Sequence, residues 1–142
     1  MIDRAGPDGS MSCPSRACEP GVRILGVMRP SGHLAYLQMP AVVDQRFVAR
    51  AKAEGSPERR FRFTGDCVEN SCPQWTGERC AVADEVVSTV VVAIPTKLAA
   101  CPIRRTCRWF AQSGAGACRA CDQVVADVGG TATYRSRLAG PC

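Results

Sequence analysis

Apolar and polar residues along residues 22–39 follow a pattern that predicts a β-hairpin. The two apolar segments, VRILGVM at residues 22–28 and HLAYLQM at residues 33–39, are rich in strand-forming side chains. Between them stands RPSG, in which Pro30 and Gly32 occupy positions that turn chemistry favours. A third short strand is predicted at RRFRF, where Phe61 and Phe63 share one face.

After Pro40 the apolar positions change to helical spacing. The residues that define the apolar face are Val43, Phe47, Val48 and Ala51. They predict an amphipathic helix that begins after Pro40 and ends at Gly55. A second helix is predicted from residue 81 towards Ile94, before Pro95, although its β-branched residues also fit a buried strand.

These elements predict an α+β protein. We expect a flexible N-terminal arm at residues 1–20, a hairpin, helix and strand unit at residues 21–65, and a cysteine-rich metal-binding region with short helices at residues 66–142, all within one compact domain. No run of about 18 apolar residues is present to span a membrane. Because the first residues lack the apolar segment of a signal peptide, we expect a cytoplasmic protein with reduced thiols.

Ten cysteines in 142 residues direct attention to metal chemistry. Four of them follow the spacing Cys-x5-Cys-x10-Cys-x2-Cys, namely Cys101, Cys107, Cys118 and Cys121. A second group lies in CVENSCPQWTGERC and consists of Cys67, Cys72 and Cys80. The N-terminal pair is Cys13 and Cys18, and either one is a candidate for the missing fourth ligand of the second group. The alternative for this pair is that neither cysteine is a ligand, and His33 is a further reserve candidate.

The spacing of these cysteines favours an iron-sulfur cluster over zinc. Structural zinc sites often contain two Cys-x2-Cys turns, whereas only Cys118 and Cys121 form one here. The ligands of a cluster can come from separated turns, and Cys-Pro steps are frequent around such ligands. We therefore predict one or two clusters of the [4Fe-4S] type, with zinc as the alternative. In general character, residues 67–121 resemble small cysteine-rich iron-sulfur proteins of bacteria.

The formal charge of +5 comes mainly from arginine. Arg104, Arg105 and Arg108 stand among the thiols, and we predict that they offset the negative charge of a thiolate-bound cluster. Catalysis by this chain alone is not expected, since it has no phosphate-binding loop of the GxxxxGK type and its single histidine has no catalytic partner nearby in the sequence.

Two roles fit these features. In the first, the protein is an electron-transfer or redox-sensing accessory whose α+β unit docks a partner protein. In the second, a metal-stabilised protein binds nucleic acid with phosphate-binding and base-stacking side chains. The arginines predicted to contact phosphates are Arg59, Arg60, Arg62, Arg104, Arg105 and Arg108, and the residues predicted to stack on bases are Phe61, Phe63 and Trp109. The spread of charge favours the first role, because phosphate binding usually needs a concentrated basic face.

Overall fold

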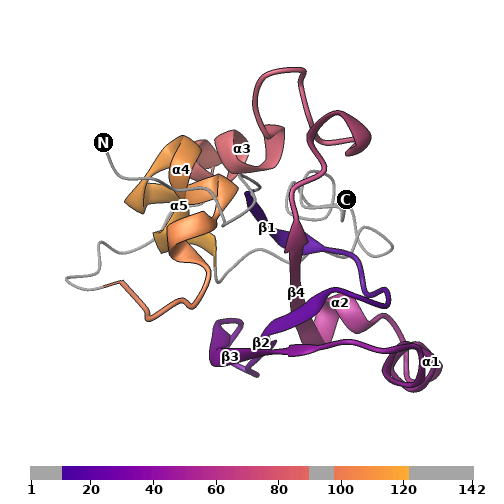
Figure 1. Ribbon diagram of the computed structural model, residues 1–142. Helices are drawn as coiled ribbons and strands as arrows, with labels where there is room; N and C mark the ends of the chain where they lie inside the picture. The colour runs from indigo at the N-terminus through magenta and orange to yellow at the C-terminus, as the bar shows by residue number, and fades with distance from the viewer. Residues whose placement is uncertain (1–10, 90–97, 122–142) are drawn as a thin grey trace.

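The computed structural model describes residues 11–89 and 98–121, which form an α+β fold (Figure 1). The strands are β1 (Ser12–Arg16), β2 (Arg23–Met28), β3 (Leu34–Val42) and β4 (Phe61–Asp66). The helices are α1 (Gln45–Ala53), α2 (Pro57–Arg60), α3 (Ala81–Thr89), α4 (Arg108–Ser113) and α5 (Ala115–Cys121). Two single 3₁₀ turns are η1 (Glu69–Ser71) and η2 (Arg104–Thr106). The predicted fold class is confirmed.

The four strands form one antiparallel sheet in the order β1-β4-β2-β3. The predicted hairpin is confirmed as β2 and β3, with Val27 opposite Ala35. Its turn is closed by the amide of Arg29, which donates to the carbonyl oxygen of His33 at 2.9 Å. Gly32 has a φ of 90° in this turn, a conformation that is unfavourable for residues other than glycine.

Residues 12–16 were assigned to a flexible arm by the sequence, but they form the edge strand β1. Ser12 pairs with Asp66 and Cys13 with Gly65, and the amide of Cys67 donates to the carbonyl oxygen of Met11 at 2.8 Å. The segment has little apolar alternation, so its strand character was not apparent. Backbone pairing with β4 and the burial of Cys13 hold it in the sheet.

The predicted amphipathic helix is confirmed as α1. Asp44 caps its first turn by accepting a hydrogen bond from the amide of Phe47 at 2.8 Å. The helix begins later than the sequence predicted, because Ala41 and Val42 still pair with β2. It ends before Gly55, whose φ of 114° is unfavourable for other residues.

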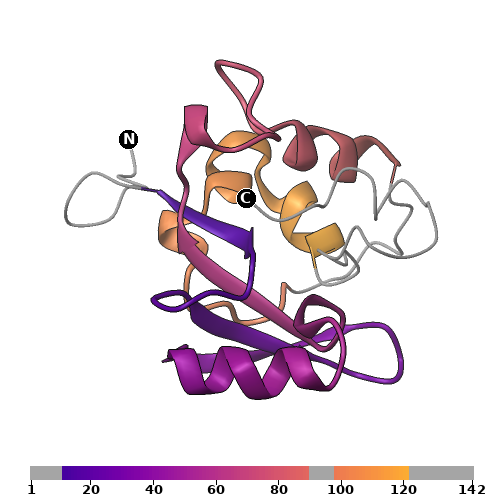
Figure 2. The ribbon, with the colours of Figure 1, turned by 90° about the vertical axis from the view of Figure 1, so that its right-hand side faces the viewer.

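The sheet separates two hydrophobic cores. Figures 1 and 2 show α1 on one side of the strands and α3, α4 and α5 on the other. The core beside α1 contains Cys18, Val22, Val43 and Phe63, with Ile24, Phe47, Val48 and Phe61 at its margin. The core beneath the other helices contains Leu25, Cys80, Val82, Ala83, Ile103, Cys107, Trp109, Ala117, Ala120 and Cys121. Small residues and thiols therefore dominate the second core.

Gly26 lies where β2 and β3 approach closely, so we expect it to tolerate no side chain. A Cβ atom at this position would lie 2.6 Å from the carbonyl oxygen of Ala35. Gly26→Ala is expected to lower the free energy of unfolding by about 1–3 kcal/mol in urea denaturation. The matched control is Gly116→Ala in α5, where a Cβ would lie 3.6 Å from Val87 and the change is expected to be neutral or slightly stabilising. Equal denaturation midpoints for the two variants would contradict this account.

Strand β3 is an outer edge of the sheet, and it carries exposed apolar side chains. Met39 is 86% exposed and Val42 is 72% exposed. In the described part of the chain, no helix is both long enough and apolar enough to span a bilayer. The predicted helix beyond residue 89, the tail after residue 121 and Cys142 lie outside the described residues.

Candidate metal centre

One cavity on the helical side of the sheet is lined by four thiols. It lies between β2 and β3 on one side and η2, α4 and α5 on the other. Its volume is about 20 Å³, enough for about one water molecule. The thiols that line it are Cys101, Cys107, Cys118 and Cys121. The structure therefore brings together the four cysteines that the sequence grouped.

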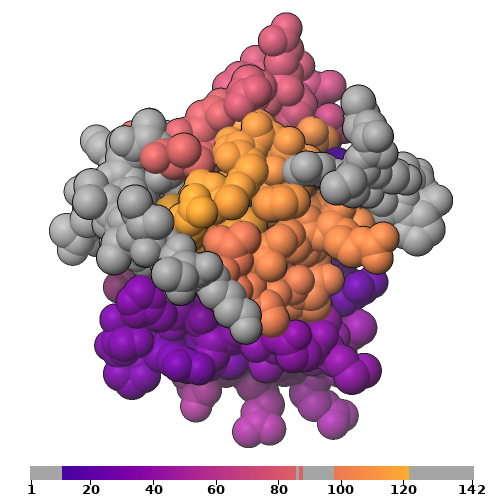
Figure 3. Space-filling model, turned by 90° about the vertical axis from the view of Figure 1, so that its left-hand side faces the viewer, coloured from indigo at the N-terminus to yellow at the C-terminus, as the bar shows by residue number. Residues whose placement is uncertain are grey.

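Short local elements position each of these thiols. Cys107 is the N-cap residue of α4, and Cys101 lies just before η2. Cys118 and Cys121 lie three residues apart on α5, a spacing that places both on one helical face. The segment that carries all four, residues 98–121, forms the centre of one face of the molecule (Figure 3). Cys101 and Cys118 are only half buried, so the cavity is close to the surface.

Backbone amides point at the sulfur atoms in a repeated local geometry. In the described residues, five cysteines accept a hydrogen bond at Sγ from the amide two residues later. They are Cys13, Cys72, Cys80, Cys101 and Cys107. Three of them are followed by proline, which cannot continue regular hydrogen bonding and favours a turn. Amides directed at sulfur stabilise the thiolate form and are a common means of tuning iron-sulfur sites.

A buried arginine contacts one of the four thiols. Arg62 is 1% exposed, and its guanidinium donates to Sγ of Cys121 at 3.3 Å and to the carbonyl oxygen of Cys121 at 2.8 Å. It also reaches the carbonyl oxygen of Pro14 at 3.5 Å. Tyr36 forms a further side-chain hydrogen bond with Cys121. The sulfur of Cys121 therefore contacts one cationic group and one hydroxyl group.

The three arginines predicted to lie beside the thiols have different environments. Arg104 lines the cavity and forms a side-chain hydrogen bond with Cys118. Arg105 is exposed. Arg108 pairs with Glu69 at 3.2 Å and stacks over the ring of Trp75 at 5.0 Å. Among the described residues, the buried Nε atoms of Arg104 and Arg119, both on the thiol-bearing segment, have no hydrogen-bond partner. Donors therefore remain available beside the thiols.

Burial raises the pKa of three of the cavity thiols, Cys101, Cys107 and Cys118, and neighbouring thiols raise it further. These three thiols therefore favour the protonated form at neutral pH in the absence of metal. The guanidinium of Arg104 opposes this effect at Cys118. Protonated buried thiols are poor nucleophiles, which argues against simple thiol catalysis. A metal ion would displace these protons on binding.

A second group of thiols lies on the other side of Trp109. Burial raises the pKa of Cys13 to about 12, and the nearby Cys67 and Cys80 contribute to the increase. Cys80 immediately precedes α3 and accepts hydrogen bonds from the amides of that helix and from the side chain of Trp109. Because Trp109 also lines the first cavity, it contacts both groups of thiols.

The side chain of Gln112 fixes the backbone of Cys80. Its Oε1 accepts from the Cys80 amide at 2.9 Å, and its Nε2 donates to the Cys80 carbonyl oxygen at 2.9 Å. The same Nε2 reaches Oδ1 of Asp84 at 2.9 Å. A double contact from α4 thus holds the first turn of α3 against the thiol-bearing helices.

Three other candidate ligands are placed differently. Cys18 packs with Val22, Val43 and Phe63 in the core beside α1, separate from the second thiol group. Cys72 is disulfide-bonded, contrary to the reduced thiols that the sequence predicted, so it could serve as a ligand only after reduction. His33 is exposed at the tip of the hairpin.

The donor set suits a metal, but the thiols must move to receive one. Thiolates are soft ligands that suit iron-sulfur clusters and zinc. Within residues 11–89 and 98–121, no three His, Cys, Asp or Glu side chains are already arranged to hold a metal ion. The cavity would also have to widen, since its volume is only about 20 Å³. The thiol-bearing turns are short and separate, which allows such an adjustment.

Three side chains that were predicted to contact nucleic acid are buried in the structure. Arg62, Phe63 and Trp109 are almost fully buried, with exposed fractions of 1%, 0% and 2%. They cannot reach phosphates or stack on bases in this conformation. Sequence reasoning missed the contact between Arg62 and Cys121, because the two residues are far apart in the chain and no local pattern joins them.

No known family model, curated protein or solved structure matches this chain. Its function must therefore be inferred from its own side chains and their arrangement.

Proposed function

We propose that this chain is a small iron-sulfur protein that acts as an electron-transfer or redox-sensing accessory to a partner protein. A [4Fe-4S] cluster would be held by the four thiols that line one cavity, Cys101, Cys107, Cys118 and Cys121. Their shared cavity is the observation that carries the proposal. A bound cluster supplies a one-electron couple whose potential depends on nearby charge and on hydrogen bonds to sulfur.

The surrounding residues have distinct roles in this proposal. Arg62 and Tyr36 donate to the sulfur of Cys121 and stabilise its thiolate. Trp109 packs beneath the cavity, where its burial excludes water. The position of residues 98–121 on one face suits electron exchange with a docked protein (Figure 3).

The second thiol group is proposed as a second metal site. Cys13, Cys67 and Cys80 lie close enough to influence one another electrostatically. This arrangement favours Cys13 over Cys18 as the N-terminal ligand. Cys72 could complete the set after reduction of its disulfide.

Anaerobically purified protein is expected to be brown, with absorption near about 400 nm and nearly equal amounts of iron and sulfide. Replacing Cys118 with serine is expected to remove the iron of one cluster. The matched control is Cys18→Ser, because Cys18 is also buried but lies in the other core. Iron and sulfide analysis, together with the visible spectrum, provides the measurement.

Two results would overturn the proposal. Colourless protein with stoichiometric zinc would show that the site holds a structural zinc ion and not a cluster. Equal iron loss in Cys118→Ser and Cys18→Ser would show that the cavity is not the specific site. Loss of part of the iron in Cys67→Ser, with the Cys118 site retained, would support a separate second centre.

A further inference from the structure

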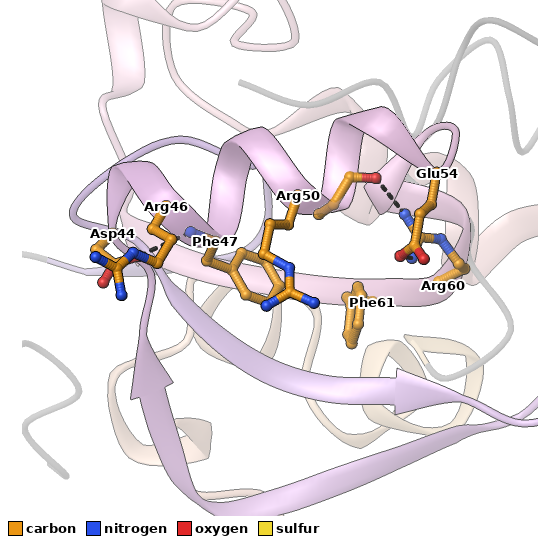
Figure 4. A pocket seen from close by; sticks show the side chains of 8 residues that line it. Asp44, Arg46, Phe47, Arg50, Glu54, Arg60 and Phe61 are labelled. Carbon is orange, nitrogen blue, oxygen red and sulfur yellow. Dashed lines mark hydrogen bonds and ion pairs between the residues drawn. The ribbon is translucent and has the colours of Figure 1, made fainter.

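A groove of about 370 Å³ lies between α1 and the junction of α2 with β4 (Figure 4). It is beside the aromatic core, whereas the thiol cavity is on the opposite face of the sheet. Its floor contains Phe47 from α1 and Phe61 from β4, whose ring centroids are 5.5 Å apart in an edge-to-face arrangement. Both side chains are only half buried, so apolar surface is accessible in the groove.

Two cationic side chains at this groove have no partner in the described part of the chain. Arg46 and Arg50 are exposed, line the groove and make no ion pair or side-chain hydrogen bond with another described residue. They are four residues apart on α1, a spacing at which like charges weaken a helix. An anionic ligand would remove this repulsion, so the pair is better suited to a bound state than to the free helix.

A third arginine is fixed at the far end of the groove. Arg60 donates to the carbonyl oxygen of Ala51 at 2.6 Å and lies 3.7 Å from the carboxylate of Glu54. Its guanidinium is 5.5 Å from the ring centroid of Phe61. Arg60 is therefore a fixed wall of the groove, and Arg46 and Arg50 remain the adaptable cations.

We propose that this groove docks an acidic segment of a partner protein. Carboxylates of that segment would pair with Arg46 and Arg50, while an apolar side chain between them would pack on Phe47 and Phe61. Aromatic anchors bounded by charged side chains are typical of protein recognition surfaces. The carboxylates of Asp44 and Glu54 also line the groove and would repel a continuous phosphate backbone, which favours a peptide over nucleic acid.

The test uses the full-length protein with nitrogen-15 labelling and a blocked peptide of sequence Glu-Asp-Leu-Phe-Glu-Asp. We expect amide shifts confined to α1 and the start of β4, and weaker binding at high salt. A double variant, Arg46→Gln with Arg50→Gln, is expected to lower the affinity roughly five- to tenfold. The matched control makes the same change to glutamine at Arg23 on β2 and at Arg29 in the hairpin turn. Both residues are exposed, and the control should leave the affinity unchanged.

Three outcomes would overturn this proposal. The first is no shift at millimolar concentrations of the acidic peptide. The second is equal binding of a peptide in which lysine replaces every acidic residue. The third is stronger perturbation of the same amides by a single-stranded oligonucleotide. None of these results depends on metal content, so failure here is distinguishable from failure of the iron-sulfur proposal.

Discussion

Removal of the proposed cluster is expected to abolish the fixed packing of α3, α4 and α5 while the sheet and α1 remain folded. The core beneath these helices consists mainly of alanine and cysteine side chains, and its larger members are Leu25, Val82, Ile103 and Trp109. Because most of these side chains are small, their burial provides limited hydrophobic stabilisation of the helical layer. Binding of metal to thiolates is coupled to folding and supplies about 10–16 kcal/mol in small zinc peptides.

The opposite core is expected to stay packed without metal. Phe47, Phe61 and Phe63 form a set of aromatic contacts with centroid separations of 5.5 to 6.2 Å. This group packs against Val22 and Val43. We therefore expect the two faces of the sheet to lose their order separately.

Tryptophan signals provide a selective measurement of this effect. Trp75 and Trp109 are the two tryptophans of the chain, and both pack in or against the thiol-rich core. Chelation should abolish their near-ultraviolet dichroism, whereas amide signals from β2, β4 and α1 should remain dispersed. Retention of the tryptophan dichroism after complete metal removal would show that the helical layer folds without metal.

Replacing Arg62 with methionine is expected to destabilise the metal-loaded protein by about 3–5 kcal/mol, because it leaves the negative sulfur of Cys121 without its buried cation. In the metal-free protein the loss should be about 1–3 kcal/mol, because the carbonyl oxygens of Pro14 and Cys121 lose the donor that Arg62 supplies. The reduction potential of any remaining cluster should fall, since a nearby positive charge stabilises the more negative reduced state.

Urea denaturation of loaded and metal-free protein measures this difference. Arg23→Met is the matched control, because Arg23 is exposed on β2 of the same sheet and should change stability by less than about 0.5 kcal/mol. Arg62→Lys keeps the charge but cannot reproduce the forked contacts, so an intermediate loss is expected. If Arg62→Met lowers the free energy of unfolding equally with and without metal, the contact of Arg62 with the Cys121 sulfur is not the cause of the loss.

Much of the sheet and its first helix could be predicted from local patterns. Alternation at residues 22–39 predicted the hairpin because one face of each strand packs on a core. Helical spacing from Val43 to Ala51 predicted α1, whose first turn Asp44 caps. β1 escaped prediction because its stability comes from pairing with β4, which is about fifty residues away in the sequence.

The thiol grouping was predictable, but its electrostatic surroundings were not. Cysteine spacing is local, so Cys101 and Cys121 could be assigned to one set from the sequence. The alternation around Phe61 and Phe63 places Arg62 on the opposite face of the strand. From the sequence alone, that face was predicted to be accessible to phosphates. Helices from the last third of the described chain cover that face, and this long-range packing changes Arg62 from a surface cation into a buried one.

Pro40 in the exposed edge strand β3 has a consequence for behaviour at high concentration. Among the described strands none pairs with the outer edge of β3, and an edge that displays Met39 and Val42 is a template on which another extended chain could assemble. Proline has no amide hydrogen, so it interrupts the row of donors that an incoming strand would need. Pro40, which directly follows Met39, is therefore expected to hinder intermolecular sheet growth.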